Sequence, residues 1–349
     1  MDNRRSTQRT AVLLIASVLI VITTTAALLS SAGREPTGLQ LILSPHPDDE
    51  LLVWAAIEDD PSSFTVVVAL TRGEATGRCA GVAQFTQQQA GEELPDPLPA
   101  PGDTAACGRA RTQAWSDFLL RASKRTDEIR LGPAARWVVA DDRWGGDADF
   151  AVGDNAAHVV LSLPDGALDQ ASIIAAVQAL LTSRGELLPD LPLRRILSAG
   201  YWNDSDQHGG NTTDSGDCPT EEDCPGTPTA FEYEHPDHRS LSLTMTKLAA
   251  LTGADAWISV PPGEASDLRR AVRSDSGQVR TMTLSPADYE ALMGLGPVGE
   301  QGPQRLGLQQ QLYGWLAFPG EWWPPGEVSD TDVLFARQQT YFVIPGGNQ

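Results

Sequence analysis

Two short segments of the chain combine imidazole and carboxylate side chains at spacings that suit a metal centre. The first is SPHPDDE at 44–50, and the second is EHPDH at 234–238. A turn can bring His46 and Asp49 onto one metal ion and leave Asp48 beside it, where an ionised carboxylate can act as a general base. The chain has only 5 histidines, and these two segments hold 3 of them. The pair of motifs therefore predicts metal-dependent hydrolysis.

The alternative for the first segment is structural. Asp48 and Asp49 would cap a helix, and His46 would be a solvated turn residue. Both carboxyl groups are expected in the first turn of a helix over 49–58, where the positive end of the helix dipole keeps carboxylates ionised. The second segment opens a helix predicted over 237–252. Two His-Pro-Asp units at the same kind of loop-to-helix junction favour the metal site over two caps.

The pattern of the chain beyond residue 36 predicts an α/β fold, with a mainly parallel sheet and helices on both faces. Short apolar runs predict strands over 39–44, 64–71, 158–163, 194–199 and 256–260, and amphipathic patterns predict helices over 49–58, 109–123, 169–183 and 237–252. Two long loops, 79–107 and 202–234, interrupt this alternation. Sites in open α/β sheets form beyond the carboxyl ends of strands, which is where the first motif falls.

Three parts are expected along the chain: an export segment over 1–36, a core over 37–262 and a C-terminal extension over 263–349 that packs on the core. Three arginines, at positions 4, 5 and 9, precede an uncharged stretch over 11–29, which as a helix reaches about 28 Å, close to the thickness of a bilayer core. The segment either stays as a signal anchor or is cut as a signal peptide near Ala32. Either way, the rest of the chain is expected to be extracytoplasmic, with membrane contact through this segment alone.

The net charge limits the possible binding partners, and the cysteine content indicates disulfide bonds. A net charge of -21 and a pI near 4.5 exclude nucleic acid and anionic lipid surfaces as partners over most of the molecule. Four cysteines in an exported chain predict disulfides, and of the three possible pairings we expect Cys79–Cys107 with Cys218–Cys224. A thiolate metal site is the weaker alternative, because the chain lacks a Cys-x-x-Cys unit.

The segments PHPDDE and HPDH, in this order, resemble the zinc-dependent LmbE-like or PIG-L-like N-acetylglucosaminyl deacetylases. Two weaker similarities lie between them, LTRGEATG at 70–77 and LPDG at 163–166. The resemblance covers roughly residues 38–260 and implies a Rossmann-like α/β fold. It also implies a deacetylase activity with zinc as the metal.

Carried over position by position, the resemblance implies that His46, Asp49 and His238 bind zinc and that Asp48 is the general base for the attacking water. His235 would stabilise the tetrahedral oxyanion or protonate the leaving amine. Asp237 would orient His235 or a neighbouring imidazole, and Glu50 is a second candidate for such support. Three protein ligands leave one position open on the metal, as catalytic zinc sites require.

Other polar and aromatic residues have both a functional and a structural interpretation. Arg72, Arg109 and Arg111 are candidate substrate residues; the alternatives are a loop ion pair involving Glu74 for Arg72 and a helix-surface position for the other two. His158 and His208 are expected at the surface. The tryptophans that either stack on sugar rings or belong to the core are Trp202, Trp315, Trp322 and Trp323.

These observations predict an exported zinc deacetylase acting on an N-acetylglucosamine-type sugar or glycoconjugate. The alternatives are an amidase for another acyl amide, a catalytically silent glycan-binding surface protein, and an envelope protein that binds zinc only for stability. The long loop over 202–234 leads directly into the second motif, so we expect it to change the rim of the substrate pocket.

Overall fold

The computed structural model describes residues 35–76, 99–100, 102–123, 131, 135–141, 144, 146–200, 235–260, 277–293, 307–312 and 337–347. The chain divides into two compact units, Met1–Pro36 and Thr37–Gln349, and every element named below belongs to the second. Within the described ranges no helix is both long and apolar enough to cross a bilayer. The apolar stretch 11–29 lies outside those ranges, so its role as an anchor or signal stays a prediction.

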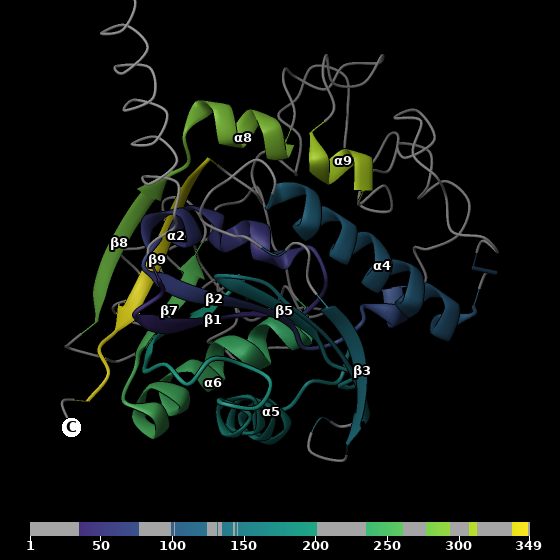
Figure 1. Ribbon diagram of the computed structural model, residues 1–349, viewed down its shortest axis with the longest axis horizontal. Helices are drawn as coiled ribbons and strands as arrows, with labels where there is room; N and C mark the ends of the chain where they lie inside the picture. Colours follow the sequence, from purple (N-terminus) through teal and green to yellow (C-terminus); the bar gives the residue numbers. More distant parts are fainter. Residues whose placement is uncertain are drawn as a thin grey trace, which may run out of the picture. The chain divides into compact units, whose positions relative to one another are not determined.

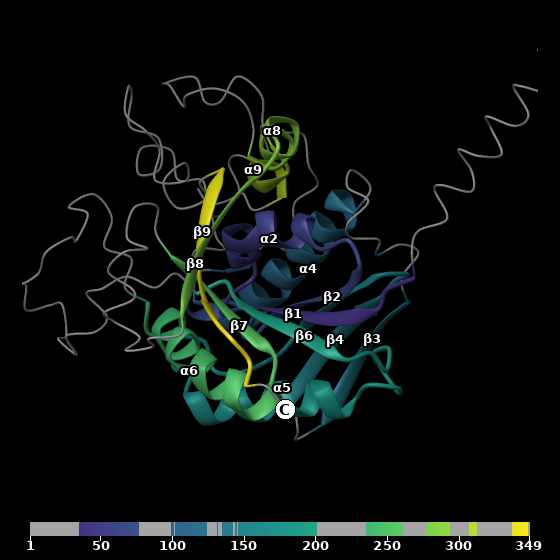
Figure 2. The same ribbon diagram turned by 90° about the vertical axis from the view of Figure 1, so that its left-hand side faces the viewer.

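The described strands form one mixed sheet in the order β3-β4-β5-β2-β1-β6-β7-β9-β8. Their bounds are β1 Gly38–Ser44, β2 Ser63–Ala69, β3 Ala135–Asp141, β4 Gly146–Val152, β5 Ala156–Val160, β6 Leu193–Ser198, β7 Asp255–Val260, β8 Gln278–Thr283 and β9 Gln338–Ile344. Neighbouring strands from β5 to β7 run parallel, whereas β3 and β4 on one side and β9 and β8 on the other pair antiparallel (Figure 2). The predicted α/β class is confirmed. The expectation of a mainly parallel sheet holds for the five central strands and is wrong for the outer four.

Helices pack against the sheet through two separate apolar clusters. The helical elements are η1 Asp49–Val53 and η2 Glu74–Thr76, both 3-10 turns, and the helices α2 Trp54–Asp59, α4 Thr104–Ala122, α5 Gln170–Thr182, α6 Pro236–Thr252, α8 Pro286–Met293 and α9 Leu308–Leu312. Along β1, Ile42 joins the cluster of α2 and α4, whereas Leu41 and Leu43 join that of α5 and α6, as expected for side chains that alternate across a strand. Figure 1 shows α2 and α4 above the central strands and α5 and α6 below them.

Local capping explains where the main helices begin and end. The Asp103 side chain accepts the Ala106 N–H at 2.9 Å, so α4 starts five residues before the predicted helix, and Cys107 lies in the helix, not in a loop. Pro236 at the first position and Gly253 at the end, with φ of 70°, define α6, because proline tolerates the first turn and glycine the left-handed cap. The other predicted strands and helices are found within a few residues of their expected bounds.

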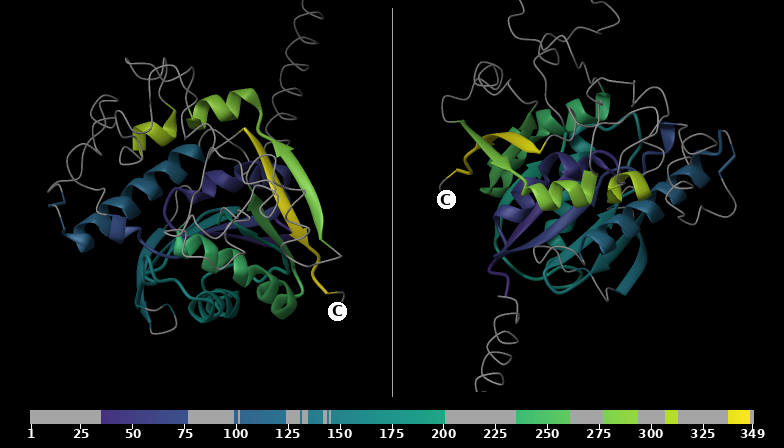
Figure 3. Two further views of the ribbon diagram at one scale, coloured as in Figure 1. Left: turned by 180° about the vertical axis from the view of Figure 1, so that it is seen from behind. Right: turned by 90° about the horizontal axis from the view of Figure 1, so that it is seen from above.

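The C-terminal part contributes to the same sheet. β9 pairs with β7 and β8 with β9, while α9 contacts both α4 and α8 (Figure 3). Gln339 of β9 accepts the Ala55 N–H at 2.9 Å and donates to the Leu51 carbonyl at 2.6 Å. These contacts join β9 to the segment that follows the first motif.

Two features between β2 and β6 differ from expectation. The hairpin of β3 and β4 had no predicted counterpart. His158 was expected at the surface, and this is wrong: it lies in β5, is 1% exposed, and its Nε2 is 3.2 Å from the Ser116 hydroxyl. A histidine inside an apolar run is buried here because a hydroxyl on α4 provides it with a polar partner.

Candidate metal centre

The two motifs meet beyond the carboxyl ends of the parallel strands. His46 follows β1, Asp165 follows β5, and α6 begins with the second motif. From β1 the chain passes along the α2 face to β2, whereas β6 lies on the other side of β1 and its neighbouring helix α6 covers the opposite face. In open α/β sheets, sites usually lie beyond the carboxyl ends of the strands at such a reversal.

Three potential ligand atoms form a tight triangle. His46 Nδ1 lies 3.2 Å from Asp49 Oδ2 and 3.3 Å from His238 Nε2, and the third side, between His238 Nε2 and Asp49 Oδ2, is 3.3 Å. All three residues are at most 5% exposed. The His46 N–H of the backbone also donates to Asp49 Oδ2, at 2.9 Å, which fixes the turn between them. The predicted ligand set is therefore brought together by the fold.

Two carboxylates lie on the other side of the His46 ring. Nε2 is 3.1 Å from Asp165 Oδ1 and 3.2 Å from Asp237 Oδ2. Carboxylates accept only, so they favour a proton on Nε2 and leave the Nδ1 lone pair for the triangle. Although burial alone would lower it, the pKa of His46 is raised above its ordinary value by Asp165, Asp237 and Asp49.

His235 lies at the more open side of the cluster. Its side chain is 31% exposed, its ring packs edge-on against His46 with centroids 4.5 Å apart, and its Nδ1 accepts the Asp237 N–H at 3.4 Å. Burial, together with the charges of His46 and His238, lowers the pKa of His235 to about 4. The ring is neutral near pH 7, and the backbone contact places its proton on Nε2.

The cluster as a whole could hold a metal ion. Two groups of side chains offer ligand atoms that lie within 4.8 Å of one another: His46, His235 and His238, and His46, Asp165, His235 and Asp237. Asp49 contacts two members of the first group, as described above. Imidazole and carboxylate donors suit first-row transition metals.

Asp48 has an unusual backbone. Its φ is 123°, the only positive value at a non-glycine residue among those described, and such conformations are costly and persist only where surrounding contacts enforce them. Arg111 Nη2 lies 3.3 Å from Asp48 Oδ2 and donates to the Pro47 carbonyl at 3.2 Å. Burial raises the pKa of Asp48, and the charge of Arg111 opposes that rise.

The expected effect of a helix dipole on the two aspartates is wrong for Asp48. Asp48 precedes η1 without a side-chain cap, and Asp49 is the first residue of a 3-10 turn. Burial alone would also raise the pKa of Asp49, but His238 and His46 hold it well below its usual range. Burial and neighbouring charges, more than the helix terminus, determine the ionisation of both groups.

Glu50 holds the backbone of the first motif through hydrogen bonds. It is 0% exposed, and its Oε2 accepts the indole N–H of Trp115 at 2.8 Å and the backbone N–H of Asp48 at 3.1 Å. The carboxylate thus connects α4 with the residue next to Asp49. This contact with the Asp48 backbone could not be inferred from the sequence spacing.

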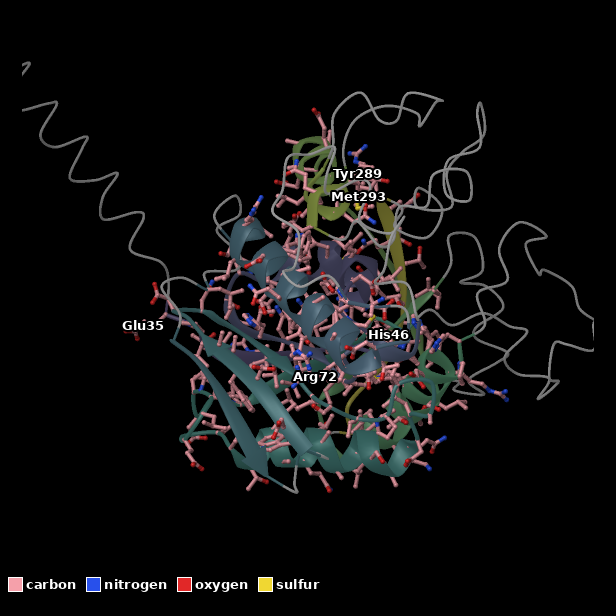
Figure 4. The ribbon with its side chains drawn as sticks, turned by 90° about the vertical axis from the view of Figure 1, so that its right-hand side faces the viewer. Glu35, His46, Arg72, Tyr289 and Met293 are labelled. Carbon is pink, nitrogen blue, oxygen red and sulfur yellow. The ribbon has the colours of Figure 1, made fainter. Side chains whose placement is uncertain are left out.

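The three candidate substrate arginines lie in different surroundings. Arg111 has a side chain only 3% exposed and contacts Asp48. Arg109 is exposed on α4. Arg72 pairs with Asp149 at 2.9 Å and also donates to Ser162 and Thr112, so its ion-pair partner is Asp149 and not the Glu74 of the structural alternative. Figure 4 labels His46 and Arg72, which lie well apart from Tyr289 and Met293 of α8.

Asp165 is a site residue that the sequence interpretation missed. Its Oδ1 contacts His46, its Oδ2 accepts the Ala75 N–H, and the Thr71 hydroxyl lies 3.5 Å from Oδ1. Although burial alone would raise it, the pKa of Asp165 is lowered to about 2, chiefly by His46. The LPDG segment at 163–166 contains Asp165, but its similarity to the family pattern assigns no role to that residue.

Several predicted residues lie outside the described part of the chain. They are Cys79, Cys218, Cys224, Trp202, His208, Trp315, Trp322 and Trp323. Cys107 takes part in a disulfide bond, and the pairings Cys79–Cys107 and Cys218–Cys224 stay predictions. A search of protein-family models, of curated proteins and of solved structures finds no match to this chain.

Proposed function

We propose that this protein is a zinc-dependent hydrolase of the LmbE-like or PIG-L-like kind that removes the N-acetyl group from an N-acetylglucosamine-type sugar or glycoconjugate. The observation that carries the proposal is the triangle of His46, Asp49 and His238, with sides of 3.2 to 3.3 Å, directly beside the buried carboxylate of Asp48. A general base next to a three-ligand metal site is the arrangement that amide hydrolysis requires.

The triangle fits zinc in size and in donor chemistry. Nitrogen and carboxylate ligands at about 2.0–2.1 Å from a tetrahedral zinc ion lie about 3.3–3.4 Å apart. Two imidazoles and one carboxylate are also a ligand set that zinc hydrolases use, with the fourth position left for substrate or water. The carboxylates of Asp165 and Asp237, 3.1 and 3.2 Å from His46 Nε2, would orient this ligand and raise its basicity.

The sheet supports the same family. Numbered along the chain, the five parallel strands β1, β2, β5, β6 and β7 stand in the order 3-2-1-4-5, which is the order of the Rossmann-like fold. Together with the helices packed on both faces, this supports the Rossmann-like architecture that the motifs imply. The deacetylase core over 37–262, with the remainder as an extension packed on it, is part of the proposal.

Zinc bound in the triangle would polarise the acetyl carbonyl and make a water molecule more acidic. Asp48 accepts a proton from the attacking water, whose oxygen forms the new bond to the acetyl carbon. Neutral His235 donates a hydrogen bond from Nε2 to the oxyanion of the tetrahedral intermediate. The C–N bond then breaks, the amine nitrogen takes the proton collected by Asp48, and the products are the free amino sugar and acetic acid, which releases its remaining proton to solvent and becomes acetate.

The cellular setting is proposed from the sequence. The segment 1–36 would direct the protein to the extracytoplasmic side, as an anchor or as a cleaved signal, and the substrate would be a surface or secreted sugar conjugate. The disulfide of Cys107 supports an oxidising compartment. The high negative charge of -21 makes a polyanionic substrate unsuitable.

Acetate release from a panel of N-acetylated amino sugars tests the proposal on the full chain. We expect release by the zinc-loaded wild type, loss on chelation with recovery on adding zinc, and a loss of at least about 100-fold in Asp48→Ala, within the range that general bases contribute. Asp154→Ala, at an exposed site on the hairpin side of the sheet, is the control and should keep full activity. Undiminished turnover in Asp48→Ala would show that the assigned base is wrong.

The ligand assignment has its own test. Zinc stoichiometry measured by atomic emission should fall from one per chain to near zero when His46 and His238 are both replaced by alanine. Stoichiometric zinc in this double variant would place the metal elsewhere. Retention of zinc without acetate release from any probe in the wild type would instead favour a role for zinc in stability alone.

A further inference from the structure

Two side chains on one face of α4 converge on Asp48. Arg111 and Trp115 are four residues apart in the helix, so they project from the same face, and both are buried. Arg111 Nη2 lies 3.3 Å from the Asp48 carboxylate. Trp115 Nε1 donates at 2.8 Å to Glu50, whose same oxygen accepts the Asp48 N–H at 3.1 Å. The side chain and the backbone of Asp48 are thus both held from α4.

The geometry points to Arg111 and Trp115 as positioning residues that hold Asp48 in its reactive orientation, with Arg111 acting on the base and not on substrate. This inference rests on the proposed function, because it assumes that Asp48 is the general base. It reverses the sequence-based expectation that Arg111 contacts substrate, and it gives Trp115 a role that the motifs do not indicate.

The conformation of Asp48 is the first argument. A non-glycine residue at φ 123° is strained and persists only where its surroundings enforce the conformation. Glu50 accepts the Asp48 N–H at 3.1 Å, and Arg111 donates to the Pro47 carbonyl at 3.2 Å, so both polar atoms of the peptide group that precedes this φ angle are held. Both contacts that enforce this strained conformation lead to α4, one directly through Arg111 and the other from Glu50 through Trp115.

The inaccessibility of Arg111 is the second argument. Its side chain is 3% exposed, and the backbone of Gly73 covers it so closely that a Cβ at position 73 would lie 2.5 Å from Arg111 Nε. A guanidinium that is nearly inaccessible to solvent and is enclosed by Pro47, Asp48 and Gly73 is poorly placed to contact a sugar. A fixed cation next to a buried carboxylate is instead suited to hold that carboxylate in one place.

The test uses five variants of the full chain. Three of them are Arg111→Gln, Arg111→Lys and Trp115→Phe, and the control for Arg111→Gln is Arg121→Gln, a matched change of charge near the far end of the same helix. Phe118→Leu is the control for Trp115→Phe, because it changes a buried aromatic ring of α4 that packs on Trp54. Zinc content, melting temperature, and kcat and KM for acetate release from N-acetylglucosamine and its glycosides are measured for each.

We expect kcat to fall about 10- to 100-fold in Arg111→Gln and Trp115→Phe, because small displacements of a reacting group have effects of this size. KM should stay within about twofold, and zinc stoichiometry and the controls should match the wild type. Arg111→Lys should recover part of kcat, since lysine keeps the charge but not the planar fork. A raised KM with normal kcat in Arg111→Gln would overturn the inference and make Arg111 a substrate residue, and unchanged kinetics would overturn it as well.

Amide hydrogen exchange separates this inference from the proposed function. A peptide spanning residues 46–53 should exchange faster in Arg111→Gln and Trp115→Phe than in the wild type or the controls, because the first variant loses the contacts of Arg111 with Pro47 and Asp48 and the second loses the donor that fixes Glu50, the partner of the Asp48 amide. If the wild type releases no acetate from any probe, the proposed function fails, yet faster exchange still supports the hold on Asp48. Unchanged exchange in both variants would overturn it.

Discussion

Asp237 and His46, 191 residues apart in the chain, meet through Asp237 Oδ2 and His46 Nε2 at 3.2 Å. The same carboxylate accepts the Gly166 N–H at 2.7 Å on Oδ2 and the Leu168 N–H at 2.9 Å on Oδ1. It is 0% exposed. One buried carboxylate therefore joins the end of β1, the segment after β5 and the start of α6, which are the three elements that build the candidate metal centre.

Replacing Asp237 by asparagine should weaken metal binding and destabilise the fold together. The asparagine amide cannot accept both backbone N–H groups and the His46 N–H, so one buried donor loses its partner, at a cost of about 1–3 kcal/mol. Loss of an orienting carboxylate typically lowers metal affinity about 10- to 100-fold. Zinc titration against a competing chelator and thermal melts of zinc-loaded and zinc-free protein measure the two effects.

The exposed carboxylate Asp190 provides the control, and Asp190→Asn should leave both quantities unchanged. The sharper comparison is Asp165→Asn, which removes the other carboxylate at His46 Nε2 but does not disturb the amides of Gly166 and Leu168. It should lower affinity with a smaller change in melting temperature. Wild-type affinity in Asp237→Asn would show that this carboxylate does not orient a metal ligand.

The central part of the fold is predictable because strands that are buried on both faces have a recognisable apolar sequence. β1 and β2 are buried along their whole length, so they read as continuous apolar runs. β8 consists of exposed and half-buried residues without regular alternation, and its place in the sheet depends on pairing with β9, which no local pattern specifies. The β3–β4 hairpin escapes prediction because its pairing, too, is set by a neighbour, here β5.

The candidate site, like the fold, has residues that the sequence predicts and residues that it does not. His46, Asp49 and His238 could be named because residue type and spacing carry the chemistry. The contacts of Asp165 and Glu50 depend on which loop and helix pack beside the motif, and only the fold determines that. The φ of 123° at Asp48 could not be predicted, because aspartate adopts positive φ only occasionally and the contacts that enforce it here come from α4 and Glu50.

His235→Asn should separate catalysis from metal binding. Asparagine is a favourable N-cap, so α6 should begin as before, whereas the imidazole N–H is lost. We expect unchanged zinc stoichiometry and melting temperature with kcat lower by about 10²–10³-fold, the effect of losing one donor to an oxyanion. Loss of zinc in this variant would instead make His235 a metal ligand. Steady-state kinetics and metal analysis of the same preparation decide between the two.

Gly73→Ala should impair both stability and turnover. At φ of 64° an L-residue is strained, by about 1–2 kcal/mol, and the new Cβ would press on the Arg111 side chain at 2.5 Å from Nε. Gly102→Ala is a matched control, because Gly102 has φ of 83° with no atom within 4 Å of a Cβ placed there. Both variants should lose stability in denaturant titrations, but only Gly73→Ala should lower kcat. Equal kcat values in the two variants would contradict a role for this contact.

Asp60 makes the stability of the fold depend on pH at a place remote from the metal centre. Its carboxylate accepts the hydroxyls of Ser63 and Ser62 at 2.6 and 2.7 Å, with Arg195 Nη2 at 4.0 Å. Although partial burial would raise it, these partners lower the pKa of Asp60. A carboxyl group with a lower pKa in the folded state stabilises the fold above its unfolded pKa, about 3.9, and loses that contribution as pH falls through the folded value.

The difference in unfolding free energy between the wild type and Asp60→Asn should therefore be largest above about pH 5, on the order of 1 kcal/mol for a partly exposed carboxylate, and should shrink as the pH falls below about 4. Urea titrations across this range measure it. Asp154→Asn, an exposed change on the same sheet, should show no such trend. A difference for Asp60→Asn that stays constant with pH would mean that the serine contacts do not distinguish the charged carboxylate from a neutral amide.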